Sequence, residues 1–325
     1  MILVIIFFSA QPVQAQSSCS ARRSYAVSLN PLFGMVYGQA EELVYPGSKN
    51  KAPLLSELLW DMKPVFYYGL SLGLSQADPR ERWGAFANFS LKYGIPGMSG
   101  SMEDRDWQSV ENADLTNYSK HDNYTRELFF FDFAGGLSFP FRRVMLLKVY
   151  VDVSFMRLSF VGMDGYGTYA YESGGLWSGI YDSIEAPTAN EWTWKGAVIS
   201  YTQEWLTFAP GVSFGYFFHP TFLAELTFLA SPLVFCVDLD EHKIGDSQYQ
   251  DDMRGGLLIE PGIRLSYAAT KWLDISWEFS WRYISGTKGD IYQRGPIGTG
   301  IWEDGGTAGA GLSIINTALI FKMRL

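Results

Sequence analysis

Large apolar residues alternate with polar residues over several long stretches of the chain. In the clearest stretch, residues 272–283, every second position from Leu273 on is a large apolar residue, and the positions between carry Asp, Ser, Glu or Arg. The same alternation covers residues 149–155, 257–267 and 315–325. Because successive side chains of a strand point to opposite faces, each stretch predicts a strand with one apolar and one polar face. A helical period is not evident in any long segment.

Short turns and longer polar loops separate these stretches. The short turns are expected at 76–81, 139–142, 219–220 and 269–271, and the long loops at 46–53, 100–123, 171–191, 243–251 and 292–305. Four short turns alternating with five long loops give ten strands, with both chain ends on the side of the short turns. Apolar-out and charged-in alternation of this kind is typical of a transmembrane β-barrel. Strands of roughly 18–20 residues exceed the ~9–11 that cross a bilayer, so the barrel should extend above the membrane.

One of the expected strands changes parity. Between Phe222 and Phe228 the even positions are apolar, whereas between Cys236 and His242 the even positions are polar. Pro232 lies between the two parts, and proline within a strand commonly marks a bulge. We therefore expect a bulge near this proline.

The composition fits an exported barrel. Of the 325 residues 47% are hydrophobic and 16% aromatic, yet the mean hydropathy is −0.01 and no stretch approaches the ~18–20 apolar residues of a spanning helix. The apolar run Met1–Phe8 followed by Val13-Gln14-Ala15 predicts a secretory signal over residues 1–15, with residues 16–325 as a single barrel domain. This segment lacks the usual basic residues, so the natural start could lie upstream; a buried first strand is the alternative.

Charge and cysteine content narrow the function classes. The net charge of −9 disfavours a nucleic-acid partner, which would require a basic surface, and suits an acidic cavity that receives basic peptides. The only two cysteines, Cys19 and Cys236, lie far apart and make no disulfide framework.

Two short acidic clusters carry the candidate chemistry. Asp104 and Asp106 form one, and Asp238, Asp240 and His242 form the other. Residues i and i+2 of an extended chain share a face, so each cluster presents its side chains as a row. The two rows form a candidate active site if their strands face each other across a cavity.

Two other interpretations of these clusters remain open. The residues could be a hydrogen-bonded pair at a strand end and a solvated loop motif. Three aspartates and a histidine could also bind Ca²⁺ or Zn²⁺, although zinc favours more nitrogen or sulfur ligands and the chain has three histidines. We interpret His219 as a structural turn residue, His121 as a surface loop residue and Ser119 as a bystander, and we expect no metal.

Several segments resemble the omptin family, ten-stranded outer-membrane proteases that cut peptides at basic residues. Residues 97–107 (GMSGSMEDRDW) look like the omptin segment with the acidic pair, and residues 238–242 (DLDEH) look like its aspartate–histidine segment. Residues 38–45 (GQAEELVY) are similar to the first-strand segment with a specificity glutamate, and residues 199–203 (ISYTQ) resemble a mid-barrel segment. The order and spacing also match over most of the mature chain.

The resemblance implies an all-β, ten-stranded antiparallel barrel in the bacterial outer membrane, with its active site facing the extracellular side. It implies an endopeptidase whose partners are basic peptides or proteins and outer-membrane lipid, acting as a monomer without a cofactor. The implied catalytic residues are Asp104, Asp106, Asp240 and His242, and the implied substrate-binding residues are Glu42 and Asp238. Asp240 would orient His242 and raise its basicity, so that a water held opposite the carboxylates attacks the scissile carbonyl.

One position departs from the family pattern. Omptins bind lipopolysaccharide through outward charged residues on the middle strands, and Arg157 could match one of them. Glu204, however, stands where an arginine would be expected, which argues against dependence on this outer-leaflet glycolipid. Two other functions remain as alternatives: a catalytically silent barrel that acts as an adhesin or receptor, and a porin, which is disfavoured because ten strands with bulky inward residues leave little lumen.

Overall fold

The computed structural model describes residues 25–46, 51–80, 82–174, 178–295, 298–301 and 306–325, which form a single antiparallel sheet closed into a barrel. Its strands are β1 (Tyr25–Val44), β2 (Ser56–Gln76), β3 (Gly84–Gly94), β4 (Gly97–Asp106), β5 (Asn117–Phe141), β6 (Met145–Tyr169), β7 (Asn190–Thr193), β8 (Ala197–His219), β9 (Phe222–Ser231), β10 (Val234–His242), β11 (Ser247–Arg254), β12 (Leu257–Ala268), β13 (Leu273–Gly295), β14 (Gly298–Ile301) and β15 (Ala308–Arg324). Within these residues no helix is long and apolar enough to cross a membrane.

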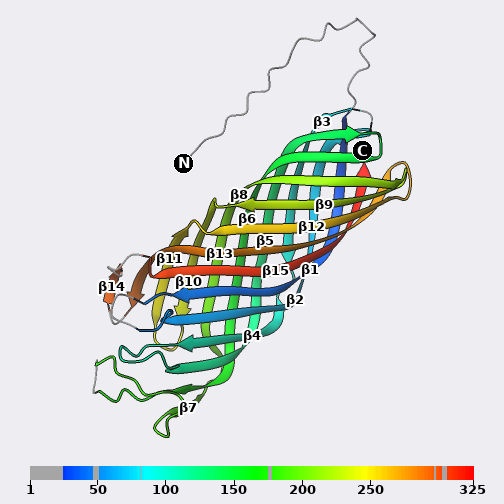
Figure 1. Cartoon of the computed structure of the whole chain (residues 1–325). Coiled ribbons are helices and arrows are strands. Elements are labelled where there is room, and N and C mark those ends of the chain that lie inside the picture. Colours follow the sequence, from blue (N-terminus) through cyan, green and yellow to red (C-terminus); the bar gives the residue numbers. More distant parts are fainter. Residues whose placement is uncertain (1–24, 47–50, 81, 175–177, 296–297, 302–305) are drawn as a thin grey trace, which may run out of the picture.

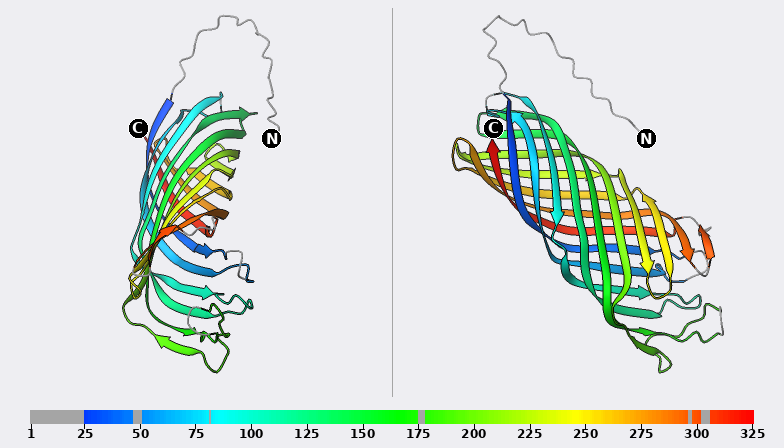
Figure 2. Two further views of the ribbon diagram at one scale, coloured as in Figure 1. Left: turned by 90° about the vertical axis from the view of Figure 1, so that its left-hand side faces the viewer. Right: turned by 180° about the vertical axis from the view of Figure 1, so that it is seen from behind.

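The ring has ten strands, as the sequence predicts. Three of them are interrupted, so that β3 continues into β4, β9 into β10 and β11 into β12. Neighbours in the ring are antiparallel, and β15 pairs with β1 to close it. The short strands β7 and β14 pair with the ends of β6 and β13, at the end of the barrel opposite the described chain ends (Figures 1 and 2).

The predicted bulge in the β9–β10 strand is confirmed. Both halves pair with β8, but the register changes by one residue between the Gly211–Leu229 pair and the Thr207–Val234 pair. The extra residue reverses which face each side chain takes. Glu225 and Asp238, of opposite parity, therefore both point into the barrel, where they are 4% and 2% exposed.

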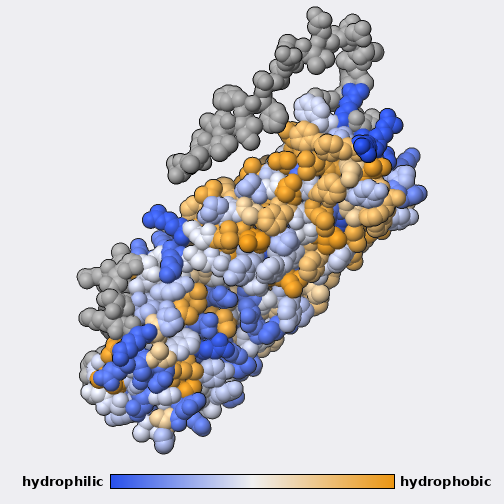
Figure 3. Space-filling model, in the orientation of Figure 1, coloured by the Kyte–Doolittle hydropathy of each residue, from blue (hydrophilic) through white to orange (hydrophobic). Residues whose placement is uncertain are grey.

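An apolar belt surrounds the half of the barrel that carries the described chain ends. On β2 the exposed large residues alternate from Phe66 to Leu74, whereas no large apolar side chain of residues 56–65 is exposed. Figure 3 shows this belt in orange towards the end of the barrel where Leu325 lies, and a largely polar surface beyond it. Nine residues match the ~9–11 that cross a bilayer, so the other half of the barrel extends beyond the membrane.

The predicted faces of β13 are confirmed. Trp277 and Trp281 point outward with 39% and 41% of their surface exposed. Arg282 is buried inside the barrel, and Glu278 lines the interior cavity. Charged side chains within the membrane are thus kept away from lipid.

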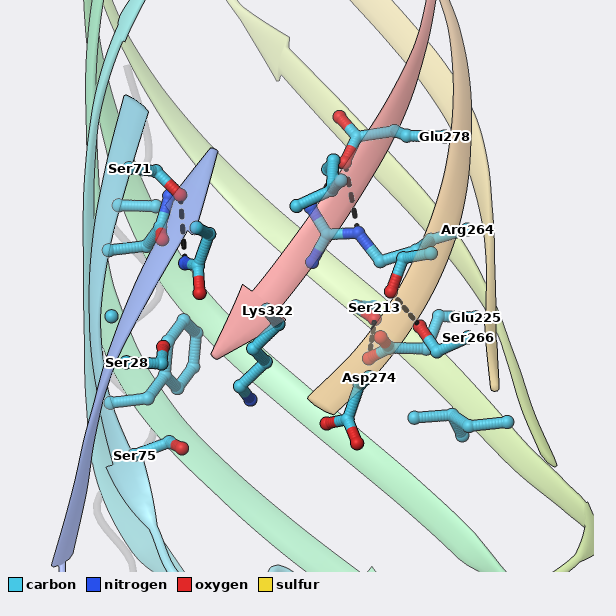
Figure 4. A pocket seen from close by; sticks show the side chains of 18 of the residues that line it. Ser28, Ser71, Ser75, Ser213, Glu225, Arg264, Ser266, Asp274, Glu278 and Lys322 are labelled. Atoms are coloured by element: carbon cyan, nitrogen blue, oxygen red, sulfur yellow. Dashed lines mark hydrogen bonds and ion pairs between the residues drawn. The ribbon is translucent and has the colours of Figure 1, made fainter. Parts of the chain in front are cut away.

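Ion pairs cross the interior of the half of the barrel that the apolar belt surrounds. A cavity of about 870 Å³ there is crossed by Lys92–Asp132, Lys148–Glu225, Arg264–Glu278 and Arg282–Glu260 pairs. Figure 4 shows Arg264 of β12 reaching Glu278 of β13, with Lys322 and Asp274 also in the cavity. Arg282 Nη1 donates to Ser154 Oγ of β6 at 2.9 Å, which links two distant walls.

We expect the Arg282→Met variant to lose on the order of 3 kcal/mol of unfolding free energy. The change leaves the Glu260 carboxylate, only 15% exposed, without the guanidinium that lies 2.6 Å away. The matched control is Lys243→Met, which breaks an exposed pair with Glu241 and should cost less than ~1 kcal/mol. Denaturant unfolding in detergent measures both, and equal stabilities of the two variants would contradict a supporting role for the interior pairs.

Three predicted loops are mostly strand, which corrects the sequence interpretation. In the expected loop 292–305, residues 292–295 belong to β13 and residues 298–301 form β14, while the others lie outside the described residues. Residues 100–106 and 117–123 of the expected loop 100–123 belong to β4 and β5, and only residues 243–246 separate β10 from β11. Both acidic clusters therefore lie within paired strands, close to their ends. All four short turns are present, but the one predicted at 139–142 lies at residues 142–144, because residues 139–141 belong to β5. The predicted signal segment, residues 1–15, and Cys19 lie outside the described residues, and Cys236 is a buried free thiol.

Candidate active site

Asp104 and Asp106 lie at the end of β4, beyond the apolar belt. Asp104 pairs in register with Leu58 of β2, eight residues along that strand from Phe66, or about 26 Å at ~3.3 Å per residue. Asp106 Oδ2 accepts hydrogen bonds from Asn117 Nδ2 at 2.9 Å and Gln108 Nε2 at 3.1 Å, which fix its orientation. Asp104 Oδ1 is buried and has no hydrogen-bond partner in the described part of the chain.

The two carboxylates of β4 hold protons more tightly than usual. Burial, followed by repulsion from Asp106, raises the pKa of Asp104 well above its ordinary range. Burial also raises the pKa of Asp106, although hydrogen bonds from Asn117 and Ser56 oppose this effect. Asp104 therefore keeps its proton to a higher pH than an ordinary aspartate, which suits it to donate a hydrogen bond.

Asp240 and His242 form a directly bonded pair at the end of β10. His242 Nε2 lies 2.6 Å from Asp240 Oδ2, and the Asp240 carboxyl is 3% exposed. The imidazole packs edge-on against Tyr249, with 43% of its side chain exposed. Burial lowers the pKa of His242, but attraction to Asp240, and then to Asp104 and Asp106, outweighs this and raises it to about 8. The ring is thus an oriented base whose Nδ1 remains available.

One residue of each pair, Asp104 and His242, faces a common cavity. Four strand-to-strand steps separate β4 from β10 around the ten-strand ring, so they lie on opposite walls. A cavity of about 450 Å³ is lined by Asp104 and His242 together with the apolar side chains of Met102, Tyr169, Trp192, Trp194, Val198, Ile199 and Ile244. This arrangement leaves space for a water molecule between the Asp104 carboxyl group and the His242 imidazole. An apolar side chain of a substrate could lie beside them.

An aromatic layer forms the floor of the site. Trp60 of β2 stacks on Tyr201 of β8 and Phe160 of β6, with ring centroids 5.4 Å and 5.7 Å apart, and all three are fully buried. In register, Trp60 lies opposite Met102, and Tyr201 opposite Asp240. This contact between opposite walls separates the site from the ion-paired interior below and lowers the polarity around its carboxylates.

Glu42 and Asp238 lie inside the barrel, close to the two acidic pairs. Glu42 of β1 is 5% exposed, and Asp238 of β10 accepts a hydrogen bond from Tyr201 Oη at 2.7 Å. Burial raises the pKa of Glu42 well above its usual range, and repulsion from Asp240 and Asp238 adds to this. The six residues predicted from the sequence are therefore gathered in one site.

Comparison with known proteins identifies the family. Residues 23–318 match the model of the Omptin family, which covers most of the chain. This chain belongs to the omptin family. The fold is similar to the crystal structure of the outer membrane protease OmpT from Escherichia coli, with 17% identity, a TM-score of 0.79 and coverage of 94% of this chain and 100% of that chain. The transport unit of the autotransporter AIDA-I from Escherichia coli matches with 11% identity, a TM-score of 0.35 and coverage of 95% and 93%. No curated protein sequence matches.

Family and fold together support an outer-membrane protease of bacterial origin. The likeness to OmpT, at 17% identity, establishes the barrel architecture, while the choice of catalytic groups rests on the geometry of this omptin's own residues. Among the described residues, no group of three or more His, Cys, Asp or Glu side chains is arranged to hold a metal ion.

Ser119 and His121 are placed differently from the sequence interpretation. Both are buried on β5, 2% and 3% exposed, and both line the cavity of His242. His121 Nε2 lies 3.0 Å from Ser119 Oγ, its Nδ1 contacts the Asp164 carbonyl, and its ring packs on Trp194. Burial lowers the pKa of His121, so this omptin carries a neutral imidazole with both nitrogens engaged. The interpretation of His121 as a surface residue is wrong, and Ser119, interpreted as a bystander, is the hydrogen-bond partner of this imidazole.

Proposed function

We propose that this omptin is an endopeptidase that hydrolyses peptide bonds beside an arginine or lysine, using a water activated between two residue pairs. The observation that carries the proposal is the 2.6 Å bond from Asp240 to His242 Nε2, on a wall that faces Asp104. The bond directs Nδ1 of the imidazole towards the cleft, where it can take a proton from water. An adhesin, a receptor or a porin would not need this hydrogen-bonded Asp–His pair.

In the proposed mechanism the water oxygen attacks the scissile carbonyl carbon while its proton passes to His242 Nδ1. Asp240 stabilises the imidazolium that forms. Asp104, which keeps its proton, donates a hydrogen bond to the developing oxyanion, and Asp106 holds the water or the substrate amide. The imidazolium then protonates the leaving amine as the C–N bond breaks. No covalent intermediate is required, so Ser119 supports His121 rather than acting as the nucleophile.

The substrate side chain before the cut occupies the pocket of Glu42 and Asp238 in this proposal. A guanidinium or ammonium group would supply the positive charge that these buried carboxylates lack, through charge-assisted hydrogen bonds. The apolar cavity of Trp192, Trp194 and Ile244 on the other side of His242 would receive an apolar side chain after the cut.

The apolar belt supports an orientation with the site on the extracellular side. The belt lies at the end that carries the described chain ends, and the site lies beyond it. We further propose that activity does not require lipopolysaccharide. On the outer surface the Arg157 guanidinium is already paired with Glu204 at 2.6 Å and Glu127 at 3.1 Å, so an anionic lipid would compete with two carboxylates.

The test is cleavage of a peptide with a single arginine by the purified barrel in detergent, without added lipopolysaccharide, from pH 5 to 9. The base must be neutral, and the pKa of His242 is raised to about 8, so the reactive fraction falls tenfold per pH unit below that value. We expect kcat/KM to rise through pH 6–8 and then level off. In Asp240→Asn the rise should move to lower pH, because the charge that raises the pKa is removed.

No cleavage at any pH would contradict the proposed function and favour the silent barrel. A profile that is flat between pH 6 and 8, or unchanged in Asp240→Asn, would remove His242 as the base. If the protein cleaved the peptide only after lipopolysaccharide is added, the interpretation of the Arg157 ion pairs would be wrong, but the proposed peptidase function would stand.

A further inference from the structure

Asp251 places a third buried carboxylate in the pocket of Glu42 and Asp238. It lies on β11 directly opposite Asp238 of β10, and it is 2% exposed. Burial is the largest cause of the raised pKa of Asp238, and repulsion from Asp251 is the second largest. Repulsion from Asp251 also contributes to the raised pKa of Glu42. Three strands, β1, β10 and β11, thus each contribute one carboxyl group to a cluster of buried acids, which we interpret as a pocket for the substrate side chain.

These carboxyl groups are left without cationic partners. Asp251 Oδ1 and Glu42 Oε2 are buried and accept no hydrogen bond from any described residue. None of the ion pairs found in the described ranges includes Glu42, Asp238 or Asp251. Asp132 and Glu225 of the interior below differ from these three acids, since each is paired with a lysine. Unpaired buried carboxyls are unfavourable, so the pocket is built for a cation that arrives with a ligand.

The neighbouring inward pair shows that the fold itself does not require acids here. Cys236 and Met253 lie opposite each other one inward step further along β10 and β11, and they are 1% and 3% exposed. A well-packed apolar pair at positions 238 and 251 would be at least as stable as two repelling carboxyls. Burial, followed by repulsion from Asp240, raises the pKa of Asp251 to about 7, so this group can hold a proton until a cation displaces it.

We propose that Asp251 is a specificity-determining residue, which binds the cationic group of the substrate side chain together with Glu42 and Asp238. The inference rests on the proposed function and extends its basic pocket by one residue. A guanidinium carries five N–H donors and an ammonium three, so either group can bond to carboxylates on several strands. A neutral side chain leaves all three acids unpaired. The pocket therefore selects its substrate by charge.

The test compares Asp251→Asn with Asp252→Asn, the matched control at the next, exposed position. The substrates are peptides that differ only in arginine, lysine or neutral citrulline before the cut. In Asp251→Asn we expect kcat/KM for the two basic peptides to fall about 10- to 100-fold, mostly through KM, because one hydrogen bond to a charged group is lost. Cleavage of the citrulline peptide should change less than about threefold, and Asp252→Asn should behave as the wild type.

An equal fall for all three peptides would assign Asp251 a structural role and overturn the proposal, as would an Asp251→Asn variant that matches Asp252→Asn. If wild type cleaves citrulline as well as arginine, the proposed basic pocket itself fails, which separates the two results. Asparagine has the shape of aspartate and removes a repulsion, so the variant should melt at a higher temperature than wild type. If it does not fold, Asp251→Ser provides the same comparison.

Discussion

Replacing His242 with alanine is expected to lower kcat for an arginine peptide by about 10³-fold, within the 10²–10⁴ that general bases contribute. The variant loses the group that takes the proton of the attacking water. His121 cannot replace it, although it lines the same cavity, because Ser119 and the Asp164 carbonyl already engage its two nitrogens. The barrel should stay folded, since His242 is the last residue of β10 and 43% of its side chain is exposed.

The matched control is His219→Ala. His219 is an exposed turn residue at the far end of the barrel, bonded to Thr221 Oγ1 at 2.8 Å, and its loss should leave kcat unchanged. Single-turnover cleavage, with circular dichroism to confirm folding, measures both variants. A folded His242→Ala variant with wild-type activity would end the proposed mechanism.

The second large effect is expected for Glu42→Gln combined with Asp238→Asn. The double variant should cleave the arginine peptide about 10²- to 10³-fold less efficiently, because removing the buried partners of a charge costs 2–5 kcal/mol. Its cleavage of a citrulline peptide should change little, so that the preference for a basic side chain disappears. The measurement is kcat/KM for the two peptides at one pH.

Glu41→Gln serves as the control for this prediction. Glu41 precedes Glu42 on β1, but its side chain takes the opposite face and is only partly buried. It should retain the full preference for arginine. If the double variant still prefers arginine, the pocket for the basic side chain lies elsewhere in the barrel.

The strands that cross the membrane could be predicted from the sequence because lipid and lumen impose opposite demands on their two faces. Residues 273–283 alternate between apolar and polar, and their inward and outward sides were predicted correctly, including Trp277, Glu278 and Arg282. The bulge at Pro232 could be predicted for the same reason, since a one-residue shift reverses the alternation.

Beyond the belt this signal disappears. Both faces of β4 and β11 meet water or a polar cleft, so polar residues occur on both faces of these strands and the segments resemble loops. Asp251 was missed in this way, within the expected loop 243–251. Ser119 and His121 were misplaced too, although Ser119, His121, Asn123 and Thr125 share one face of β5 and are all buried, a spacing that could have revealed them. The gathering of Asp104 with His242 followed from family resemblance, because periodicity does not specify which strands lie opposite each other.

The closed ring also determines how a substrate can be held. The strands that carry the six predicted site residues and Asp251, namely β1, β4, β10 and β11, are each paired on both sides, so none of them offers a free edge to a peptide backbone. A substrate cannot gain affinity by pairing with these strands, and the walls cannot part without breaking backbone hydrogen bonds. The conformational entropy lost on binding is therefore almost entirely that of the substrate. Unstructured tails and loose surface loops should be cut far faster than the same sequence folded into a helix or strand.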